Sequence, residues 1–133
     1  MGATYRIAEA AALLGVSDDT VRRWIEQGTL SSARSATGHS VVDGLELARL
    51  LKERSVRPED PARVASSARN RFVGLVTEVV SDTVMSQVEL QCGPHRVVSL
   101  MSTEAVRDLG LEPGRVATAV VKSTDVVVET PGA

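Results

Sequence analysis

The chain has 133 residues, a formal net charge of −2 and only three aromatic residues, Tyr5, Trp24 and Phe72. This length fits one domain or two small ones, and small domains bury so little surface that a partner subunit is an obvious source of further burial. The near-neutral charge argues against a general coat for nucleic acid, so any contact with DNA must come from a local cluster of cations.

Several classes of protein are disfavoured by residues that the chain lacks. It has a single cysteine, and its two histidines have no neighbours at the spacing of metal ligands. It also lacks a phosphate-binding loop and a nucleophile–base pair, so we do not expect an enzyme. There is no run of 18 apolar residues and no apolar signal-peptide core, which predicts a cytoplasmic protein with no membrane partner.

The N-terminal half has the pattern of a helix-turn-helix. Apolar residues recur at helical spacing over residues 7–14, and Gly15 ends this predicted helix. Ser17 is a good N-cap for a second helix over residues 18–27. An acidic capping box opens a third helix, which we expect over residues 43–51. Two short helices joined by a tight turn predict a helix-turn-helix.

A proline-containing connector separates the two halves. Residues 55–66 break the periodicity with Pro58, Pro61 and mixed charge, which is typical of a linker of moderate stiffness. We therefore predict a DNA-binding domain over residues 1–54, a linker over 55–66 and a second domain over 67–133.

The second half is rich in valine, which favours strands. Strands are expected over residues 72–80, 84–92, 95–100 and 116–128, the last range forming one or two strands interrupted near 123–125. One short helix is expected from Ser102 to Leu109, closed by Gly110. Five short strands and one helix predict an OB-like five-stranded β-barrel. The predicted fold class is α+β, with an all-α winged helix-turn-helix preceding this barrel.

Hydroxyls and cations flank the predicted barrel. Ser67 and Arg69 precede its first strand, and Lys122 and Ser123 follow its last long one. Ser102 opens the short helix, whose first N–H groups are free to donate. A tetrahedral oxyanion offers only acceptors, so this set of donors predicts an oxyanion-binding site.

The N-terminal residues 5–17, with 20–24 and 28–30, resemble the MerR and phage-excisionase type of winged helix-turn-helix. The resemblance covers roughly residues 4–54 and implies binding to double-stranded DNA. The second helix would enter the major groove, and the following hairpin wing would contact the backbone. The implied contact residues are Ser17, Thr20, Arg22 and Arg23 at the groove, with Arg34, Gly38 and His39 on the wing.

Three motifs in the second half resemble the molybdenum-pterin-binding (Mop) domain, the molbindin module of the wider TOBE group. They are Ser67-Ala68-Arg69-Asn70, Ser102 ahead of Leu109-Gly110-Leu111, and Lys122-Ser123-Thr124-Asp125-Val126. The resemblance implies that molybdate or tungstate binds where two such domains meet, through backbone amides and serine and lysine side chains. The implied oxyanion-binding residues are Ser67, Arg69, Ser102, Lys122 and Ser123. It also implies a homo-oligomer, for which a hexamer is favoured and a dimer is possible.

Three functions remain open from the sequence. The leading hypothesis is a transcriptional regulator that binds DNA and senses molybdate or tungstate. The second is a molybdate storage or buffering protein with an accessory DNA-binding domain. The third is an anion-independent, excisionase-like DNA-binding protein with a structural barrel.

Overall fold

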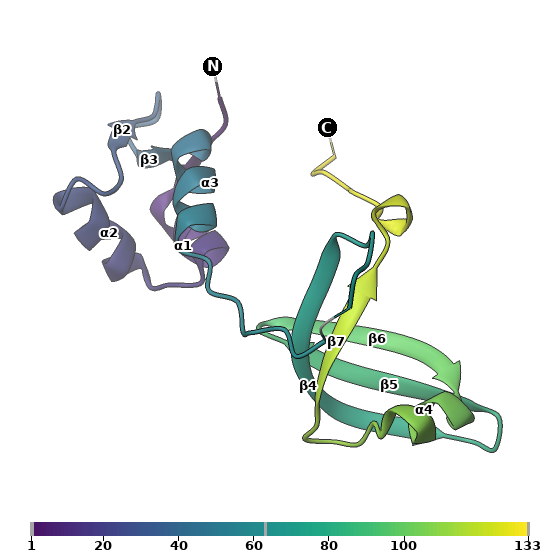
Figure 1. Cartoon of the computed structure of the whole chain (residues 1–133). Coiled ribbons are helices and arrows are strands. Elements are labelled where there is room, and N and C mark those ends of the chain that lie inside the picture. Colours follow the sequence, from purple (N-terminus) through teal and green to yellow (C-terminus); the bar gives the residue numbers. More distant parts are fainter. Residues whose placement is uncertain (1, 63, 133) are drawn as a thin grey trace. The chain divides into compact units, whose positions relative to one another are not determined.

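The computed structural model describes residues 2–62 and 64–132 of the chain. It separates into two compact units, Met1–Val56 and Arg57–Ala133, which are described one at a time (Figure 1). Within the described residues, no helix is long and apolar enough to cross a bilayer.

The first unit combines three helices with a small sheet. Its elements are β1 (Thr4–Arg6), α1 (Ile7–Leu14), α2 (Asp18–Glu26), β2 (Ser32–Arg34), β3 (Ser40–Asp43) and α3 (Gly44–Glu53). The strands form an antiparallel sheet in the order β1-β3-β2. The expectation of an all-α first half is therefore wrong. Strands of three or four residues are too short to show the alternation by which a strand is recognised in a sequence.

Local capping interactions position the helices of this unit. The Ser17 hydroxyl accepts the N–H of the third residue of α2, as predicted. At the start of α3, Asp43 accepts the Glu46 N–H at 3.3 Å. The Glu46 carboxylate does not complete the predicted capping box, because it accepts the Ser31 N–H at 2.8 Å. Glu46 thus ties α3 to the residue just before β2.

The core of the first unit consists of small aliphatic side chains. Its buried residues are Ala10, Ala11, Val21, Leu30, Val42, Leu47 and Leu50. Trp24 and Ile25 pack against this cluster from α2, as the helical spacing predicts. Trp24 is also covered on one face by the Arg54 guanidinium, 4.6 Å from the ring centroid.

The second unit is a curled antiparallel sheet with one short helix. Its elements are β4 (Asn70–Ser81), β5 (Met85–Cys92), β6 (His95–Ser102), α4 (Thr103–Leu109), β7 (Val116–Val121) and the 3-10 turn η1 (Ser123–Asp125). The sheet order is β6-β5-β4-β7, and Figure 1 shows β4 curving along its length. The core cluster comprises Val76, Val88, Leu90, Cys92 and Val106.

β4 belongs to two ladders, and this explains its curvature. Its first half pairs with β7 and its second half with β5, so that Leu75 lies opposite both Val116 and Gln91. Gly74 lies next to the point where β4 changes partner, and its position requires glycine. A Cβ at Gly74 would lie 2.3 Å from the Gln91 carbonyl oxygen and 2.7 Å from Cys92 Sγ. Only glycine allows so close an approach of two strands.

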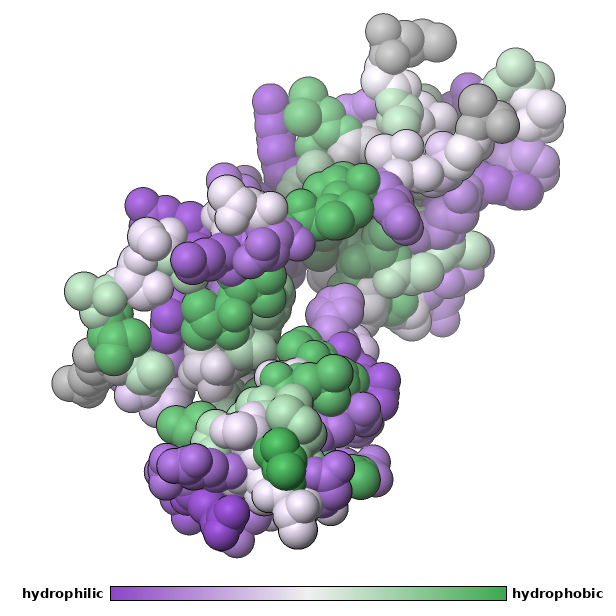
Figure 2. All heavy atoms as spheres, turned by 90° about the vertical axis from the view of Figure 1, so that its right-hand side faces the viewer, coloured by the Kyte–Doolittle hydropathy of each residue, from purple (hydrophilic) through white to green (hydrophobic). Residues whose placement is uncertain are grey.

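The expected fifth strand is not formed among the described residues. The ladder ends at Val121, η1 follows, and the next residues have no strand partner within the described part of the chain. A valine-rich pattern indicates a preference for strand but does not supply the neighbour that a strand requires. Val127 and Val128 are 84% and 81% exposed. Figure 2 shows apolar side chains, in green, on the molecular surface.

Candidate functional sites

The end of the β4–β7 ladder brings two of the predicted oxyanion motifs together. Asn70 pairs with Val121, and its side-chain amide donates to the Val121 carbonyl at 3.2 Å. The next residues outward on the two strands are Arg69 and Lys122, so their backbones are neighbours. All four predicted residues of these motifs, Ser67, Arg69, Lys122 and Ser123, are exposed.

The two cations at this end, Arg69 and Lys122, are not paired with carboxylates within the described part of the chain. In the second unit, Arg71, Arg96 and Arg115 lie within ion-pair distance of carboxylates. Among the described residues, Arg69 and Lys122 have no such partner. The ladder end therefore offers two cations without an ion-pair partner among the described residues, and such donors suit an anion.

Ser102 lies elsewhere in the same unit. It is the N-cap of α4, and its Oγ accepts the Ala105 N–H at 3.1 Å. Ser102 pairs with Met85, the residue before Ser86, and Ser86 pairs with Ser81 at the end of β4. Asn70 is the first residue of that 12-residue strand. The register thus brings Arg69 and Lys122 to one end of β4 and places Ser102 near the opposite end.

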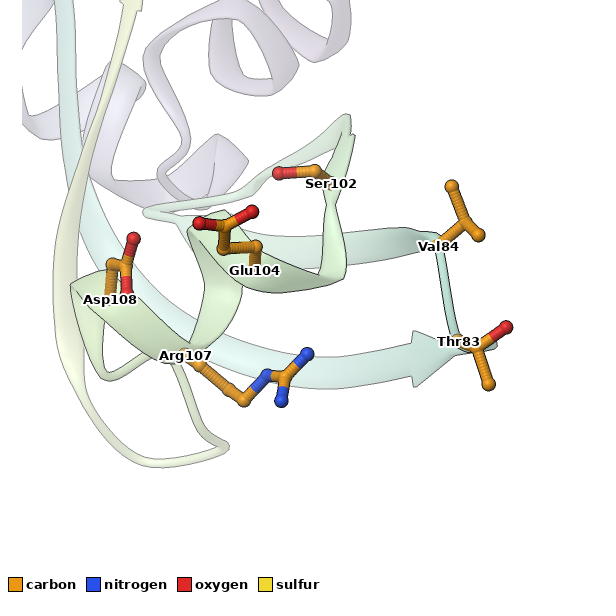
Figure 3. A pocket seen from close by; sticks show the side chains of 6 residues that line it. All are labelled: Thr83, Val84, Ser102, Glu104, Arg107 and Asp108. Atoms are coloured by element: carbon orange, nitrogen blue, oxygen red, sulfur yellow. The ribbon is translucent and has the colours of Figure 1, made fainter.

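A hollow beside α4 is lined by Thr83, Val84, Ser102, Glu104, Arg107 and Asp108. Figure 3 shows Arg107 extending from α4 toward the turn that carries Thr83 and Val84. The lining contains one guanidinium and two carboxylates, so the hollow of a single chain is not positively charged. No cluster of three potential metal-ligating side chains occurs in residues 2–62 and 64–132.

Asp60 fastens the start of the second unit to the β4–β7 pair. Its carboxylate accepts from Arg71 Nε at 2.8 Å, from Thr118 Oγ1 at 2.9 Å and from the Ala62 N–H at 2.9 Å. These bonds, with Arg71 first, hold the pKa of Asp60 below its usual value. The sequence pattern assigns Asp60 to the linker, because partners 11 and 58 residues away leave no local signal.

In the first unit, the predicted groove residues lie on α2 and at its N-cap, Ser17. The Ser17 and Thr20 hydroxyls are 3.0 Å apart, so each partly satisfies the other. Arg22 is 3.3 Å from Asp19, but both side chains are more than half exposed, and such a pair is weak. Arg23 is exposed on the same helix. The α2 arginines are therefore free to reorient toward a ligand.

The predicted wing is the β2–β3 hairpin, whose turn is closed by several hydrogen bonds. Arg34 Nη1 donates to the Gly38 carbonyl at 2.7 Å, and the His39 N–H donates to Ser35 Oγ at 3.2 Å. Sequence reasoning missed Arg6 as a site residue. Arg6 Nη2 lies 2.9 Å from His39 Nδ1. Arg6 also lines one hollow with Arg22, which connects the wing side to α2.

Comparison with known proteins identifies each unit. A helix-turn-helix domain model matches residues 4–55, and a TOBE domain model matches residues 66–128. Molybdenum-pterin-binding protein 3 of Clostridium pasteurianum is 41% identical over 63 residues, which are 47% of this chain and 93% of that protein. Molybdenum-pterin-binding protein MopA of Rhodobacter capsulatus is 33% identical over 136 residues, which span 96% of this chain and 51% of MopA.

One solved structure extends the likeness to three dimensions. The cytoplasmic molybdate-binding protein ModG, solved with molybdate bound, is 34% identical. The match covers 54% of this chain and 52% of ModG, with a TM-score of 0.50. The chain thus joins a helix-turn-helix domain to a TOBE domain. It belongs to the family of molybdenum-pterin-binding proteins, as the resemblance in its motifs predicts.

Proposed function

We propose that this protein is a cytoplasmic, DNA-binding transcriptional regulator that responds to molybdate or tungstate. The observation that carries this proposal is that MopA aligns with almost the whole chain, across both the helix-turn-helix and the TOBE domain. The first domain supplies arginines for DNA, and the second supplies a positively charged ladder end for an oxyanion.

The proposed anion ligands are Ser67, Arg69, Ser102, Lys122 and Ser123, with backbone amides. Hydroxyls and cations can donate to the four oxygens of molybdate, whereas an ionised carboxylate cannot. Within one chain, Ser102 lies near the other end of β4 from the Asn70–Val121 pair that Arg69 and Lys122 flank. A site that uses all five therefore needs Ser102 from one subunit and the ladder end from another.

Assembly of several copies follows from the same geometry. The second unit exposes many large apolar side chains, among them Val80, Val84, Leu100, Val116, Val127 and Val128. Burying them against another copy, with the C-terminal valines as an added strand of a five-stranded barrel, would supply core that one unit lacks. We favour a hexamer over a simple dimer. An anion held between subunits would then stabilise the oligomer by mass action.

Calorimetric titration with molybdate, tungstate and sulfate tests the anion site. Each lost hydrogen bond to a charged group typically costs about 1.5–3 kcal/mol, so Lys122→Ala or Ser67→Ala should weaken binding roughly ten- to a hundredfold. Arg115→Ala is the matched control, because Arg115 pairs with Glu112. Unchanged titrations for both Lys122→Ala and Ser67→Ala would reject this site.

For DNA, we propose that α2 enters the major groove and the β2–β3 hairpin contacts the backbone as the wing. Ser17, Thr20, Arg22 and Arg23 would face the groove, and Arg34 and His39 the backbone. Arg22→Ala and Arg23→Ala should weaken duplex binding and leave anion binding intact. Arg49→Ala, an exposed change on α3, is the control. Gel shifts that neither α2 substitution changes would move the DNA surface elsewhere.

A second candidate, a molybdate-buffering protein with an accessory DNA-binding domain, is favoured by one observation. The Clostridium pasteurianum relative matches over 93% of its length without a helix-turn-helix counterpart, so the second domain occurs nearly alone. DNA binding that changes with molybdate would support the regulator. DNA binding that ignores the anion would support buffering, and failure to bind any anion would leave the excisionase-like alternative.

A further inference from the structure

The contact between Arg6 and His39 determines the chemical form of the histidine. Arg6 ends β1 and His39 directly precedes β3, and their Nη2 and Nδ1 atoms are 2.9 Å apart. A guanidinium carries only donors, so Nδ1 must be the acceptor in this bond. An imidazole whose Nδ1 accepts is neutral and carries its one proton on Nε2.

We propose that Arg6 is a positioning residue for the DNA interface, which holds His39 as the neutral Nε2–H tautomer and directs that N–H toward a phosphate oxygen. The DNA part of this inference rests on the proposed function. The tautomer itself does not, because it follows from the free protein.

The rest of the wing fixes the backbone of His39. The His39 N–H donates to Ser35 Oγ, and the His39 carbonyl accepts the Ser35 N–H at 2.8 Å. Arg34 holds the Gly38 carbonyl beside it. Nε2 has no hydrogen-bond partner within the described part of the chain, and the residue is exposed. The wing thus holds the His39 backbone in place and leaves Nε2–H as a donor without a partner.

Charged groups from several elements surround the imidazole. Arg6 contacts it from β1, and Arg34 lies in the same hairpin. On α1, the Glu9 carboxylate is engaged by the Arg6 backbone N–H at 3.1 Å. On α2, Asp18 and Arg22 line the hollow that Arg6 shares. Protonating Nδ1 would break its bond to Arg6 and place a second positive charge against that guanidinium.

In this arrangement His39 and the two arginines near it contribute to DNA binding in different ways. Neutral His39 adds a directed donor but no charge, so it should contribute little to the salt dependence of DNA binding. Arg6 and Arg34 carry the charge and should set that dependence.

Nitrogen-15 NMR of the histidine rings in the full chain tests the tautomer. His95→Gln removes the only other histidine signal. We expect an unprotonated Nδ1 and a protonated Nε2 at neutral pH. Arg6→Met should give a mixture of tautomers, and Arg6→Gln should retain the original form, because its amide can still donate. A protonated Nδ1 in the wild-type background, or a tautomer unchanged by Arg6→Met, would overturn the assignment.

Binding to a pool of random-sequence duplexes tests the positioning role. Arg6→Met should weaken binding roughly tenfold, and Arg6→Gln should recover about half of that loss on a logarithmic scale. When His39→Ala is already present, Arg6→Gln should bind DNA no more tightly than Arg6→Met. Equal binding by the Gln and Met variants would show that Arg6 acts by charge alone and would refute positioning. A chain that shows the tautomer but binds no duplex would overturn the proposed function and the DNA role of His39, leaving the tautomer standing.

Discussion

Gly74→Ala should destabilise the second unit through a clash between two strands. The φ angle of Gly74 is not positive, so an alanine there meets no backbone strain, and any loss of stability comes from the steric clash alone. The new Cβ would lie 2.3 Å from the Gln91 carbonyl oxygen, which is backbone held in the β4–β5 ladder, and 2.7 Å from Cys92 Sγ. Overpacking of this kind costs about 1–3 kcal/mol, and the rigid carbonyl places this substitution toward the upper end.

Scanning calorimetry gives the corresponding shift. For a unit of this size, about 1–3 kcal/mol lowers the melting temperature by roughly 4–24 °C. Gly132→Ala is the matched control, because nothing lies within 4 Å of a Cβ there. Adding Cys92→Ala to Gly74→Ala removes the sulfur contact but leaves the carbonyl contact, so it should restore only part of the loss. A melting temperature equal to that of Gly132→Ala would refute the close approach of β4 and β5.

Three further predictions concern the same unit. Asp60→Asn should lower its melting temperature at neutral pH. The difference in melting temperature from wild type should disappear as the pH falls below the ordinary aspartate pKa of about 3.9, because the bonds that lower the pKa of Asp60 stabilise the folded state only while its carboxylate is ionised. A difference that does not change with pH would contradict this. Burial raises the pKa of the Cys92 thiol, so a thiol reagent should modify it slowly until the unit unfolds, and fast modification of folded protein would show that the site is open. Ser102→Ala should cost about 0.5–2 kcal/mol as a lost N-cap, and Ser102→Thr should retain most of that stability in urea unfolding.

Local signals in the sequence located most helices. Ser17 caps α2 as predicted, Ser102 stands at the start of α4 as its N-cap, and Gly110 ends α4 in the left-handed conformation. Capping involves residues three or four positions apart, so the sequence contains both partners of each interaction. Alternation over residues 84–92 predicts Val84, Ser86, Val88 and Leu90 on one face of a strand, and the last three are buried, whereas Val84 lies before β5 and is exposed.

Long-range pairings were not predictable from the same signals. Glu46 bonds Ser31 and not its own helix start, and Asp60 bonds Thr118. Each choice depends on which segments meet in space, and single-sequence periodicity does not report that. The Arg6–His39 contact, 33 residues apart, belongs to the same class. For the anion site, the motifs named the residues, and the β4–β7 register showed which of them are neighbours.

The distribution of aromatic residues makes the chain its own optical reporter. Trp24 is the only tryptophan, and it lies in the first unit with Tyr5, the only tyrosine. The second unit has Phe72 alone, so it is silent when fluorescence is excited at the tryptophan band. Trp24 is also covered by Arg54, near the end of the first unit, and emission should respond when that cover is lost. A change in tryptophan emission on adding molybdate would therefore report on the helix-turn-helix unit directly, without any label.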